Sequence, residues 1–265
     1  TRAVLEAVES LEVIGRAGIG VDNIDIDAAW ALEVPVLNVP EYAIEEVSTH
    51  TIALILGLVR KLYRYDAQVK DGHWDWTDGQ PIDRLTGQTI GLVAFGRIAR
   101  RVAEKLDGFD VELLAYDPYV DADEMAPYGV EKVGFDRLLG SASIVSLHAP
   151  LTAETRGLFD QDVLHRMRAG SYLINTARGE LVRTTALRDA LVDGPLAGAG
   201  IDVQETEPPD DSPLAGLDNT VLTPHAAWYS EASRREVSRR VAADVVAVLE
   251  GDQPGTVVDP DAGWY

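Results

Sequence analysis

The stretch QTIGLVAFGRIARRVAEKLDGFDVELLAYDPY, residues 88–119, decides the fold. It holds two short apolar runs, at 88–94 and 111–116, separated by a segment near 97–107 whose apolar residues recur with helical spacing. Strands that are apolar throughout are buried on both faces, which is typical of a parallel sheet covered by helices. The stretch therefore predicts a strand, a helix and a second strand parallel to the first.

The same alternation continues along the chain. Further strands are expected at 143–147, 171–175, 198–203 and 220–223, with helices at 160–168 and 184–193. Residues 86–229 are thus predicted to form a doubly wound α/β domain. A second, smaller domain is expected from both chain ends, 1–85 and 230–265. Long connecting helices are expected from about Ile44 to Val69 and from Glu231 to Leu249.

The turn after the first strand favours a dinucleotide ligand. The fingerprint Gly-x-Gly-x-x-Gly brings a pyrophosphate to a helix N-terminus, and here only its middle glycine, Gly96, is kept. Asp117, which ends the next strand, can accept the ribose hydroxyls, and no Arg follows it to receive a 2′-phosphate. We therefore predict NAD rather than NADP. The turn residues expected to contact NAD are Ala94, Phe95, Gly96, Arg97 and Ile98.

The overall charge excludes several partners. The 265 residues carry 44 Asp and Glu against 23 Lys and Arg, a formal net charge of -21. Such a chain repels phosphate backbones and anionic lipids, so neither nucleic acid nor a membrane is expected as a partner. The lack of Cys favours the cytoplasm and leaves redox chemistry to a bound cofactor. Because the cations include only four Lys, we interpret the protein as halophilic, with an ordinary acidic protein as the alternative.

Several segments resemble the D-isomer-specific 2-hydroxyacid dehydrogenase family over nearly the whole chain. They are GRAGIGVDNIDIDAA (15–29), LNVP (37–40), HAPLTAETRGL (148–158), INTARGELV (174–182), AGAGIDVQETEPP (197–209) and TPHAAWYSEAS (223–233). The last is most similar to the subgroup that includes the C-terminal-binding proteins. The resemblance implies a Rossmann domain, a smaller flavodoxin-like substrate domain shortened at its N-terminus, a site in the cleft between them, and a homodimer.

The resemblance also implies three catalytic residues. His225 would protonate the C2 oxygen of a 2-oxo acid, because imidazole titrates near neutral pH. Glu207 would orient this ring and stabilise its positive charge, and Arg178 would bind the substrate carboxylate through its planar guanidinium. The predicted function is that of an NAD-dependent D-2-hydroxyacid dehydrogenase. The alternatives are a 3-phosphoglycerate or hydroxypyruvate/glyoxylate reductase and, in another class, an NAD(H)-sensing scaffold similar to the C-terminal-binding proteins.

Further contacts come from the family pattern alone. Asp202 would hold the nicotinamide carboxamide, and the other residues implied to contact NAD, besides Arg178 and His225, are Thr51, Ala149, Pro150, Thr155, Thr176 and Ala177. The backbone N–H groups of Ile19 and Gly20 would bind the substrate carboxylate. Trp228 would either line the substrate pocket or pack in a domain interface.

Some prominent side chains have simpler interpretations. No metal is expected, because His50, His73, His148 and His165 share no ligand spacing. Trp74 and Trp76 are expected to pack at a domain junction. The paired arginines of the last helix, at 234–235 and 239–240, are expected to form ion pairs with Glu231 and Glu236 or to lie in a subunit contact, rather than to bind an anion.

Overall fold

The computed structural model describes residues 1–8 and 10–260, which divide into two compact units. Unit 1 comprises Thr1–Glu46, Pro150–Thr152 and the described residues from Trp228 onward. Unit 2 is larger and comprises Val47–Ala149 and Ala153–Ala227. Among the described residues, no helix is both long and apolar enough to cross a membrane.

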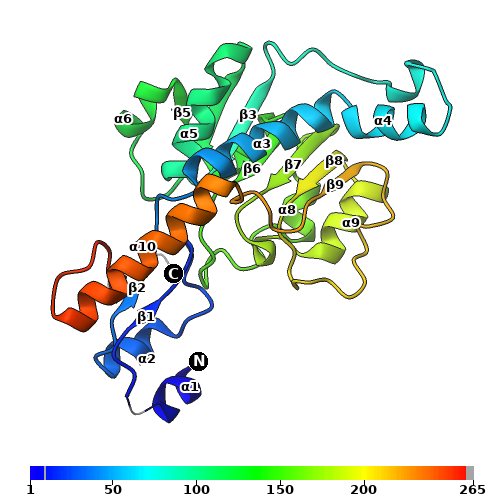
Figure 1. Ribbon diagram of the computed structural model, residues 1–265. Helices are drawn as coiled ribbons and strands as arrows, with labels where there is room; N and C mark the ends of the chain where they lie inside the picture. Colours follow the sequence, from blue (N-terminus) through cyan, green and yellow to red (C-terminus); the bar gives the residue numbers. More distant parts are fainter. Residues whose placement is uncertain (9, 261–265) are drawn as a thin grey trace. The chain divides into compact units, whose positions relative to one another are not determined.

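Unit 2 is built on a seven-stranded parallel sheet (Figure 1). Its strands are β3 (Thr89–Val93), β4 (Glu112–Tyr116), β5 (Val130–Lys132), β6 (Ile144–Leu147), β7 (Ser171–Asn175), β8 (Leu196–Ile201) and β9 (Thr220–Leu222). The strand order is β5-β4-β3-β6-β7-β8-β9, and every neighbouring pair is parallel. The order reverses between β3 and β6, which is the switch point of a Rossmann fold. The predicted fold class is confirmed, and β5, a short edge strand with two charged residues, is the strand that the apolar pattern missed.

The helices of unit 2 lie between its strands, except for the first two, which precede β3. They are α3 (Ile44–Val59, which begins in unit 1), α4 (Leu62–Lys70), α5 (Arg97–Leu106), α6 (Ala122–Met125), α7 (Phe135–Ser141), α8 (Gln161–His165) and α9 (Thr184–Val192). Short 3₁₀ turns are η1 (Thr77–Gly79), η2 (Asp107–Phe109), η3 (Ala126–Tyr128) and η4 (Gly179–Leu181).

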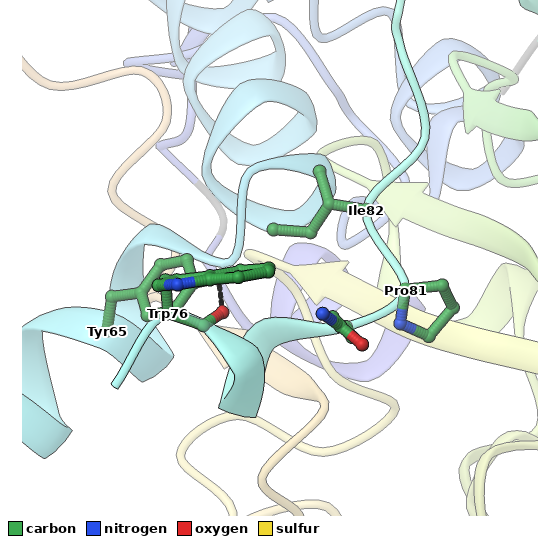
Figure 2. Close-up of a pocket in the computed structure, with 5 residues that line it drawn as sticks. Tyr65, Trp76, Pro81 and Ile82 are labelled. Atoms are coloured by element: carbon green, nitrogen blue, oxygen red, sulfur yellow. Dashed lines mark hydrogen bonds between the residues drawn. The ribbon is translucent and has the colours of Figure 1, made fainter. Parts of the chain in front are cut away.

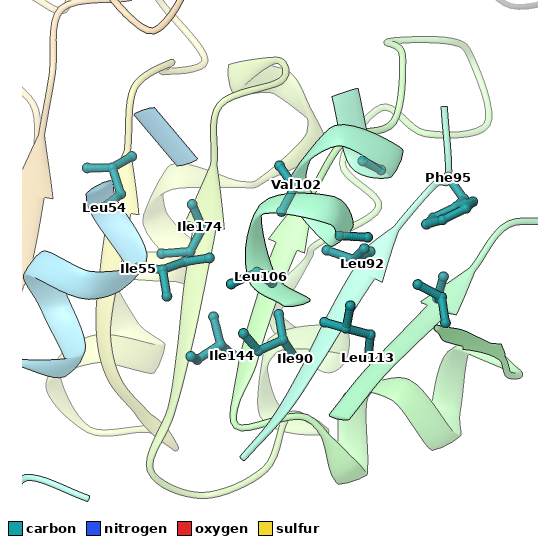
Figure 3. Close-up of a cluster of buried hydrophobic side chains, with 14 of the residues drawn as sticks. Leu54, Ile55, Ile90, Leu92, Phe95, Val102, Leu106, Leu113, Ile144 and Ile174 are labelled. Atoms are coloured by element: carbon teal, nitrogen blue, oxygen red, sulfur yellow. The ribbon is translucent and has the colours of Figure 1, made fainter. Parts of the chain in front are cut away.

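The core of unit 2 explains why its boundary differs from the expected one at residue 86. Leu54 and Ile55 of α3 are at most 1% exposed and join a cluster with Ile90, Ile144 and Ile174 from the sheet (Figure 3). At Gly200 a Cβ would lie 3.1 Å from the Cβ of Leu54, so α3 packs closely on β8. The helix is therefore part of the α/β unit, and the predicted assignment of 47–85 to the smaller domain is wrong.

The predicted helix from Ile44 to Val69 is also wrong in one respect, because the chain breaks it into α3 and α4. Lys61 lies between them with a left-handed φ of 54°. The ring of Tyr63 folds back over Gly57, where a Cβ would lie 2.4 Å from the ring. This contact accompanies the break at Lys61, in a stretch whose sequence predicts a continuous helix.

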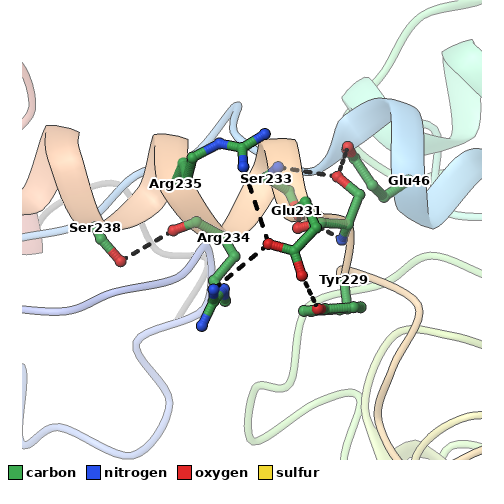
Figure 4. A network of polar contacts seen from close by, with 8 residues as sticks. Glu46, Tyr229, Glu231, Ser233, Arg234, Arg235 and Ser238 are labelled. Atoms are coloured by element: carbon green, nitrogen blue, oxygen red, sulfur yellow. Dashed lines mark hydrogen bonds and ion pairs between the residues drawn. The ribbon is translucent and has the colours of Figure 1, made fainter.

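Unit 1 contains a two-stranded parallel sheet of β1 (Ile14–Gly15) and β2 (Val36–Leu37), with α1 (Arg2–Ala7), α2 (Ile26–Ala31) and α10 (Glu231–Glu250). Helix α10 packs tightly on β1, since a Cβ at Gly15 would lie 2.7 Å from Val245. The helix begins with a capping box between Ser230 and Ser233, and Ser230 also donates to Glu46 (Figure 4). The predicted ion pairs of its arginines with Glu231 and Glu236 are confirmed.

Candidate active site

The predicted catalytic residues lie at one edge of the unit 2 sheet. Because all seven strands are parallel, the loops after them meet at the carboxyl edge. Arg178 follows β7, Glu207 lies on the segment after β8, and His225 follows β9. Three loops far apart in the sequence therefore deliver a guanidinium, a carboxylate and an imidazole to the same edge.

His225 and Glu207 form a direct pair. The distance from His225 Nδ1 to Glu207 Oε2 is 2.6 Å, and Glu207 Oε1 accepts a hydrogen bond of 2.9 Å from the backbone N–H of Gln204. Both carboxylate oxygens thus have a partner, which fixes the orientation of the group. Since Nδ1 faces Glu207, Nε2 is the ring nitrogen that remains for a substrate. The imidazole side chain is 45% exposed, so a small molecule can reach it.

Arg178 is held by the loop that carries it. Asn175, at the end of β7, donates from its side chain to the carbonyl of Arg178 (2.8 Å) and accepts from the N–H of Ala177 (3.0 Å). Arg178 Nη1 donates to the Ala177 carbonyl at 2.7 Å. The half-buried guanidinium is thus anchored on a rigid turn rather than on a mobile surface loop.

The turn from β3 to α5 has the shape that a pyrophosphate needs. Ala94 adopts the left-handed φ of 68° at the position of the first fingerprint glycine, and fully buried Ala99 packs the helix on the sheet. Gly96 is exposed, and a Cβ there would meet nothing within 4 Å. No side chain caps the helix at Gly96, so its N-terminal N–H groups are not covered by a capping residue. The two alanines that depart from the fingerprint are therefore compatible with dinucleotide binding.

Asp117 and Phe95 differ from the expected arrangement. Asp117 is 7% exposed, and its carboxylate accepts from the N–H groups of Phe95 (2.8 Å), Tyr119 (2.8 Å) and Val120 (3.2 Å). The Phe95 ring is fully buried and packs edge-on against Tyr128. Phe95 therefore acts by fixing Asp117, and its side chain faces the core rather than a ligand.

Asp202 is buried at the end of β8 and holds the segment after His225. Its Oδ1 accepts from the Ala226 N–H and its Oδ2 from the Ala227 N–H, both at 2.9 Å. The Thr223 hydroxyl also donates to Oδ1. Oδ2 keeps room for a second donor, so the predicted contact with a carboxamide stays a prediction.

The remaining residues predicted to contact NAD are distributed along the same edge of unit 2, except for Pro150, which is grouped with unit 1. Ala149 follows β6, Thr176 and Ala177 follow β7, and Thr155 lies on the segment between β6 and α8. Thr51 has no exposed surface, and its hydroxyl is 2.9 Å from that of Thr176. Thr51 is thus placed against the loop of Arg178, and contact with phosphates stays a prediction.

The predicted substrate residues outside unit 2 lie in unit 1. Ile19 and Gly20 follow β1 in a turn that Asn38 braces by donating to the Ile19 carbonyl at 2.8 Å. Within the described part of the chain, the N–H groups of Ile19 and Gly20 have no hydrogen-bond partner. Trp228 packs against Tyr42, with ring centroids 6.1 Å apart. Its predicted contact with a substrate is not tested by this packing.

Two polar residues, each beside predicted site residues of its own unit, were missed in the sequence. Arg16 precedes the same turn, and its buried Nε has no hydrogen-bond partner among the described residues. His50 bonds to Thr223 beside Asp202. A basic residue in the GRAGIG segment was a possible signal for Arg16, whereas His50 has no local signal. No group of three or more metal-binding side chains occurs in the part of the chain that the structure describes.

Residues 52–227 match the family described as "D-isomer specific 2-hydroxyacid dehydrogenase, NAD binding domain". The chain belongs to this family. Among curated relatives of this chain, a D-3-phosphoglycerate dehydrogenase of Archaeoglobus fulgidus is 39% identical over 249 residues, which cover 94% of this chain and 47% of the relative. A glyoxylate reductase of Thermofilum pendens is 38% identical over 264 residues, covering 97% of this chain and 78% of the relative.

A solved D-lactate dehydrogenase of Aquifex aeolicus, complexed with NAD and lactic acid, superposes with a TM-score of 0.89 at 32% identity. The superposition covers 95% of this chain and 80% of that one. The chain spans about half the length of the phosphoglycerate dehydrogenases that it matches. The larger unit is thus an NAD-binding domain, and NAD is the cofactor of the family to which it belongs.

Proposed function

We propose that the chain is an NAD-dependent oxidoreductase that interconverts a 2-oxo acid and its D-2-hydroxy acid. The observation that carries this proposal is the 2.6 Å pair between His225 and Glu207 on the same sheet edge as Arg178. A proton donor with a fixed orientation and a cation for a carboxylate are what carbonyl reduction requires of the protein. When bound, the reduced nicotinamide supplies the hydride.

The chain supplies the proton and holds both the proton donor and the substrate in a fixed orientation. The imidazolium of His225 transfers its Nε2 proton to the oxygen on C2, while Nδ1–H remains bonded to Glu207. Glu207 keeps the ring from rotating because Gln204 holds its other oxygen. Arg178 binds the carboxylate of the substrate in the plane of its guanidinium and polarises the neighbouring carbonyl. In the opposite direction, neutral His225 accepts the proton from the hydroxyl group.

The cofactor contacts that we propose follow the open part of the edge. The N-terminal turn of α5, at Gly96, Arg97 and Ile98, would hold the pyrophosphate, and Asp117 would accept from the ribose. Asp202 would accept from the carboxamide through Oδ2. Thr176 and Ala177 would line the nicotinamide ribose. Ala149, Pro150 and Thr155 would contact the adenosine and phosphate side.

A phosphorylated substrate is the second candidate, and Arg16 is the observation that favours it. The Arg16 guanidinium lies over Gly18, where a Cβ would be 2.1 Å from its Nη1, and its Nε has no partner among the described residues. It adds a cation to the turn whose Ile19 and Gly20 N–H groups we propose as a carboxylate site. Such a turn suits an acid with a second anionic group, as in 3-phosphoglycerate, better than glyoxylate.

The test is reduction of a panel of 2-oxo acids by NADH, including glyoxylate, pyruvate, hydroxypyruvate and 3-phosphohydroxypyruvate. His225→Ala should lower kcat roughly 10²- to 10⁴-fold while NADH still binds. A variant that keeps more than a tenth of the wild-type kcat would contradict the role of His225. Arg16→Leu should raise KM for the phosphorylated substrate and leave that for glyoxylate nearly unchanged. If both KM values rise equally, Arg16 does not select a phosphate.

A homodimer is the proposed assembly, supported by the exposed apolar surface around α4. No residue of this nine-residue helix is buried, although a helix so short is marginal in water without packing. Trp74 and Trp76 are 88% and 72% exposed, so the expected packing at a domain junction is wrong within the single chain. Trp76 lines a pocket of about 550 Å³ together with Tyr65, Gln80, Pro81 and Ile82. Figure 2 shows the side chains of Tyr65, Trp76, Pro81 and Ile82 at this pocket. A second copy would cover these aromatic rings.

Sedimentation velocity tests the assembly. Trp74→Ser with Trp76→Ser should convert the dimer to monomer, whereas Trp30→Ser, which removes another exposed indole, should not.

Membership of the C-terminal-binding-protein subgroup is a finer proposal that rests on Trp228 in the HAAWYSEAS segment. A scaffold of that kind would bind NADH without turning over any of the 2-oxo acids. The cytoplasm is the proposed compartment, on the lack of Cys.

A further inference from the structure

One turn of helix α3 reaches both loops that carry the catalytic cations. His50 Nε2 lies 3.0 Å from the hydroxyl of Thr223, two residues before His225. The next residue, Thr51, has its hydroxyl 2.9 Å from that of Thr176, two residues before Arg178. Neither His50 nor Thr51 carries out a step of the proposed reaction. The proposed reaction therefore does not explain why a histidine contacts Thr223.

Donor and acceptor counting fixes the direction of the His50 bond. The single hydroxyl proton of Thr223 is donated to Asp202 Oδ1, so the Thr223 oxygen must accept from its other neighbour. His50 is that neighbour, and it therefore carries a proton on Nε2. The same nitrogen is 3.7 Å from Asp202 Oδ1, so the imidazole also faces the buried carboxylate.

The chain of bonds ends on the backbone that carries His225. Asp202 accepts from the N–H groups of Ala226 and Ala227, and the N–H of His225 donates to the Asp202 carbonyl at 2.8 Å. His225 itself has a left-handed φ of 52°. A non-glycine residue holds this conformation only where its surroundings impose it. The bonds to Asp202 impose it here.

We propose that His50 is a positioning residue: by donating from Nε2 to Thr223, it holds Asp202 and hence the imidazole of His225 in the reactive orientation. The inference rests on the proposed function for its kinetic consequence and on the hydrogen bonds alone for its structural one. Without the His50 donor, the Thr223 hydroxyl can rotate away from Asp202. The carboxylate then loses one of its three donors, and the segment after His225 becomes less fixed.

Two pairs of variants test the proposal. His50→Leu removes the donor, whereas His50→Gln places an amide N–H where the imidazole Nε2 lies. Thr223→Val removes the hydroxyl that Thr223→Ser retains. We expect His50→Leu and Thr223→Val each to lower kcat about 10- to 100-fold, the size of effect that a displaced catalytic group produces. The KM for NADH should change less than twofold, and His50→Gln and Thr223→Ser should restore most of kcat.

The double variant His50→Leu/Thr223→Val gives an additional readout. If both residues act through one chain of bonds, the double variant should be no slower than the slower single variant. His165→Gln is the matched control, because His165 is exposed on α8 and bonds only within that helix. Multiplicative losses in the double variant, or a His50→Leu enzyme with wild-type kcat, would overturn the proposal.

Hydrogen–deuterium exchange of the segment 223–227 separates this proposal from the proposed function. In His50→Leu the amides of Ala226 and Ala227 should exchange at least tenfold faster than in the wild type, with unchanged exchange in the strands β3 and β6. This measurement needs no substrate. If the wild type reduces none of the 2-oxo acids but the exchange increases as stated, the function is wrong and the positioning holds. Unchanged exchange overturns the positioning whatever the activity.

Discussion

Gly179 lies so close to the backbone of Gln204 that a Cβ at Gly179 would be 2.0 Å from both the carbonyl carbon and the carbonyl oxygen of Gln204. Gly179 directly follows Arg178, and the N–H of Gln204 donates to Glu207. The close approach thus fixes the segment that carries the Arg178 guanidinium against the segment that orients the Glu207 carboxylate. Only a residue without a side chain can occupy this position.

Gly179→Ala should therefore separate these two segments. A methyl group at 2.0 Å cannot be accommodated by a rotamer change, because the neighbouring atoms belong to the backbone. We expect a loss of about 1–3 kcal/mol in the free energy of unfolding and a larger fall in kcat than in NADH affinity. Gly216→Ala is the control, since nothing lies within 4 Å of a Cβ there. Equal activities of the two variants would show that the approach is not needed.

We expect a preference for NADH over NADPH because of Asp117. Its carboxylate is fixed by the three N–H groups of Phe95, Tyr119 and Val120, so it cannot swing away from a 2′-phosphate. Two anions held close together repel each other, and we expect kcat/KM to be at least tenfold lower with NADPH. Fluorescence titration with both nucleotides checks the preference without a substrate. Equal or tighter binding of NADPH would show that this loop is misinterpreted.

The sequence predicted most of the unit 2 sheet, because buried parallel strands are apolar along their whole length. The strands β3, β4, β6, β7, β8 and β9 all lie within two residues of their expected bounds. The break at Lys61 could not be predicted in the same way, because neither Gly nor Pro stands at residues 59–62 to mark the end of a helix. The left-handed φ of 54° at Lys61 is not visible in a pattern of apolar residues.

The candidate site also contains one contact that was predicted from the sequence and one that was not. The pairing of His225 with Glu207 was expected from the family pattern, and the two side chains lie 2.6 Å apart. His50 was considered only as a possible metal ligand, and its partner Thr223 is 173 positions away. Polar networks that hold catalytic loops depend on which helices pack on the sheet edge. Such networks can be recognised only once the position of α3 against the sheet is known.

The pH dependence of stability should contain a contribution from His148. His148 directly follows β6, and its Nε2 lies 3.0 Å from the Ser146 hydroxyl. Burial lowers the pKa of this imidazole from 6.5 to about 4. Between these two values the unfolded chain binds a proton that the folded chain does not, so stability falls as the pH falls from 6.5 toward 4. The shift corresponds to at most about 3 kcal/mol.

Urea unfolding of the wild type and of His148→Gln between pH 4 and 7.5 measures this contribution. Glutamine stays neutral and can still bond to Ser146, so the variant should lose less stability than the wild type as the pH falls. Taking the difference between the two proteins removes the titration of the many carboxylates, which is common to both. His165→Gln, on the exposed face of α8, should run parallel to the wild type. Parallel curves for His148→Gln would mean that the ring is protonated in the folded state.

Salt should stabilise the protein, because its carboxylates outnumber its cations and leave a net charge of -21. Exposed ion pairs such as those of Arg137 with Glu131 and Arg239 with Glu236 are also screened by salt, and surface pairs of this kind contribute little to stability. The carboxylates in excess have no cation to lose. Relief of their mutual repulsion should therefore exceed the loss of the pairs.

Thermal melts from about 0.1 to 3 M KCl and NaCl test whether salt raises the stability of the protein and whether charge screening is the cause. The Debye length falls from about 10 Å at 0.1 M to about 3 Å at 1 M, so most of the rise in Tm should occur below 1 M if screening causes it. Screening depends on ionic strength and not on the identity of the cation, so the two salts should give the same curve. A Tm that stays flat or falls would contradict the halophilic interpretation. A large gap between the salts would instead assign the stabilisation to bound cations, and a rise that continues evenly to 3 M would assign it to strengthened burial of apolar surface.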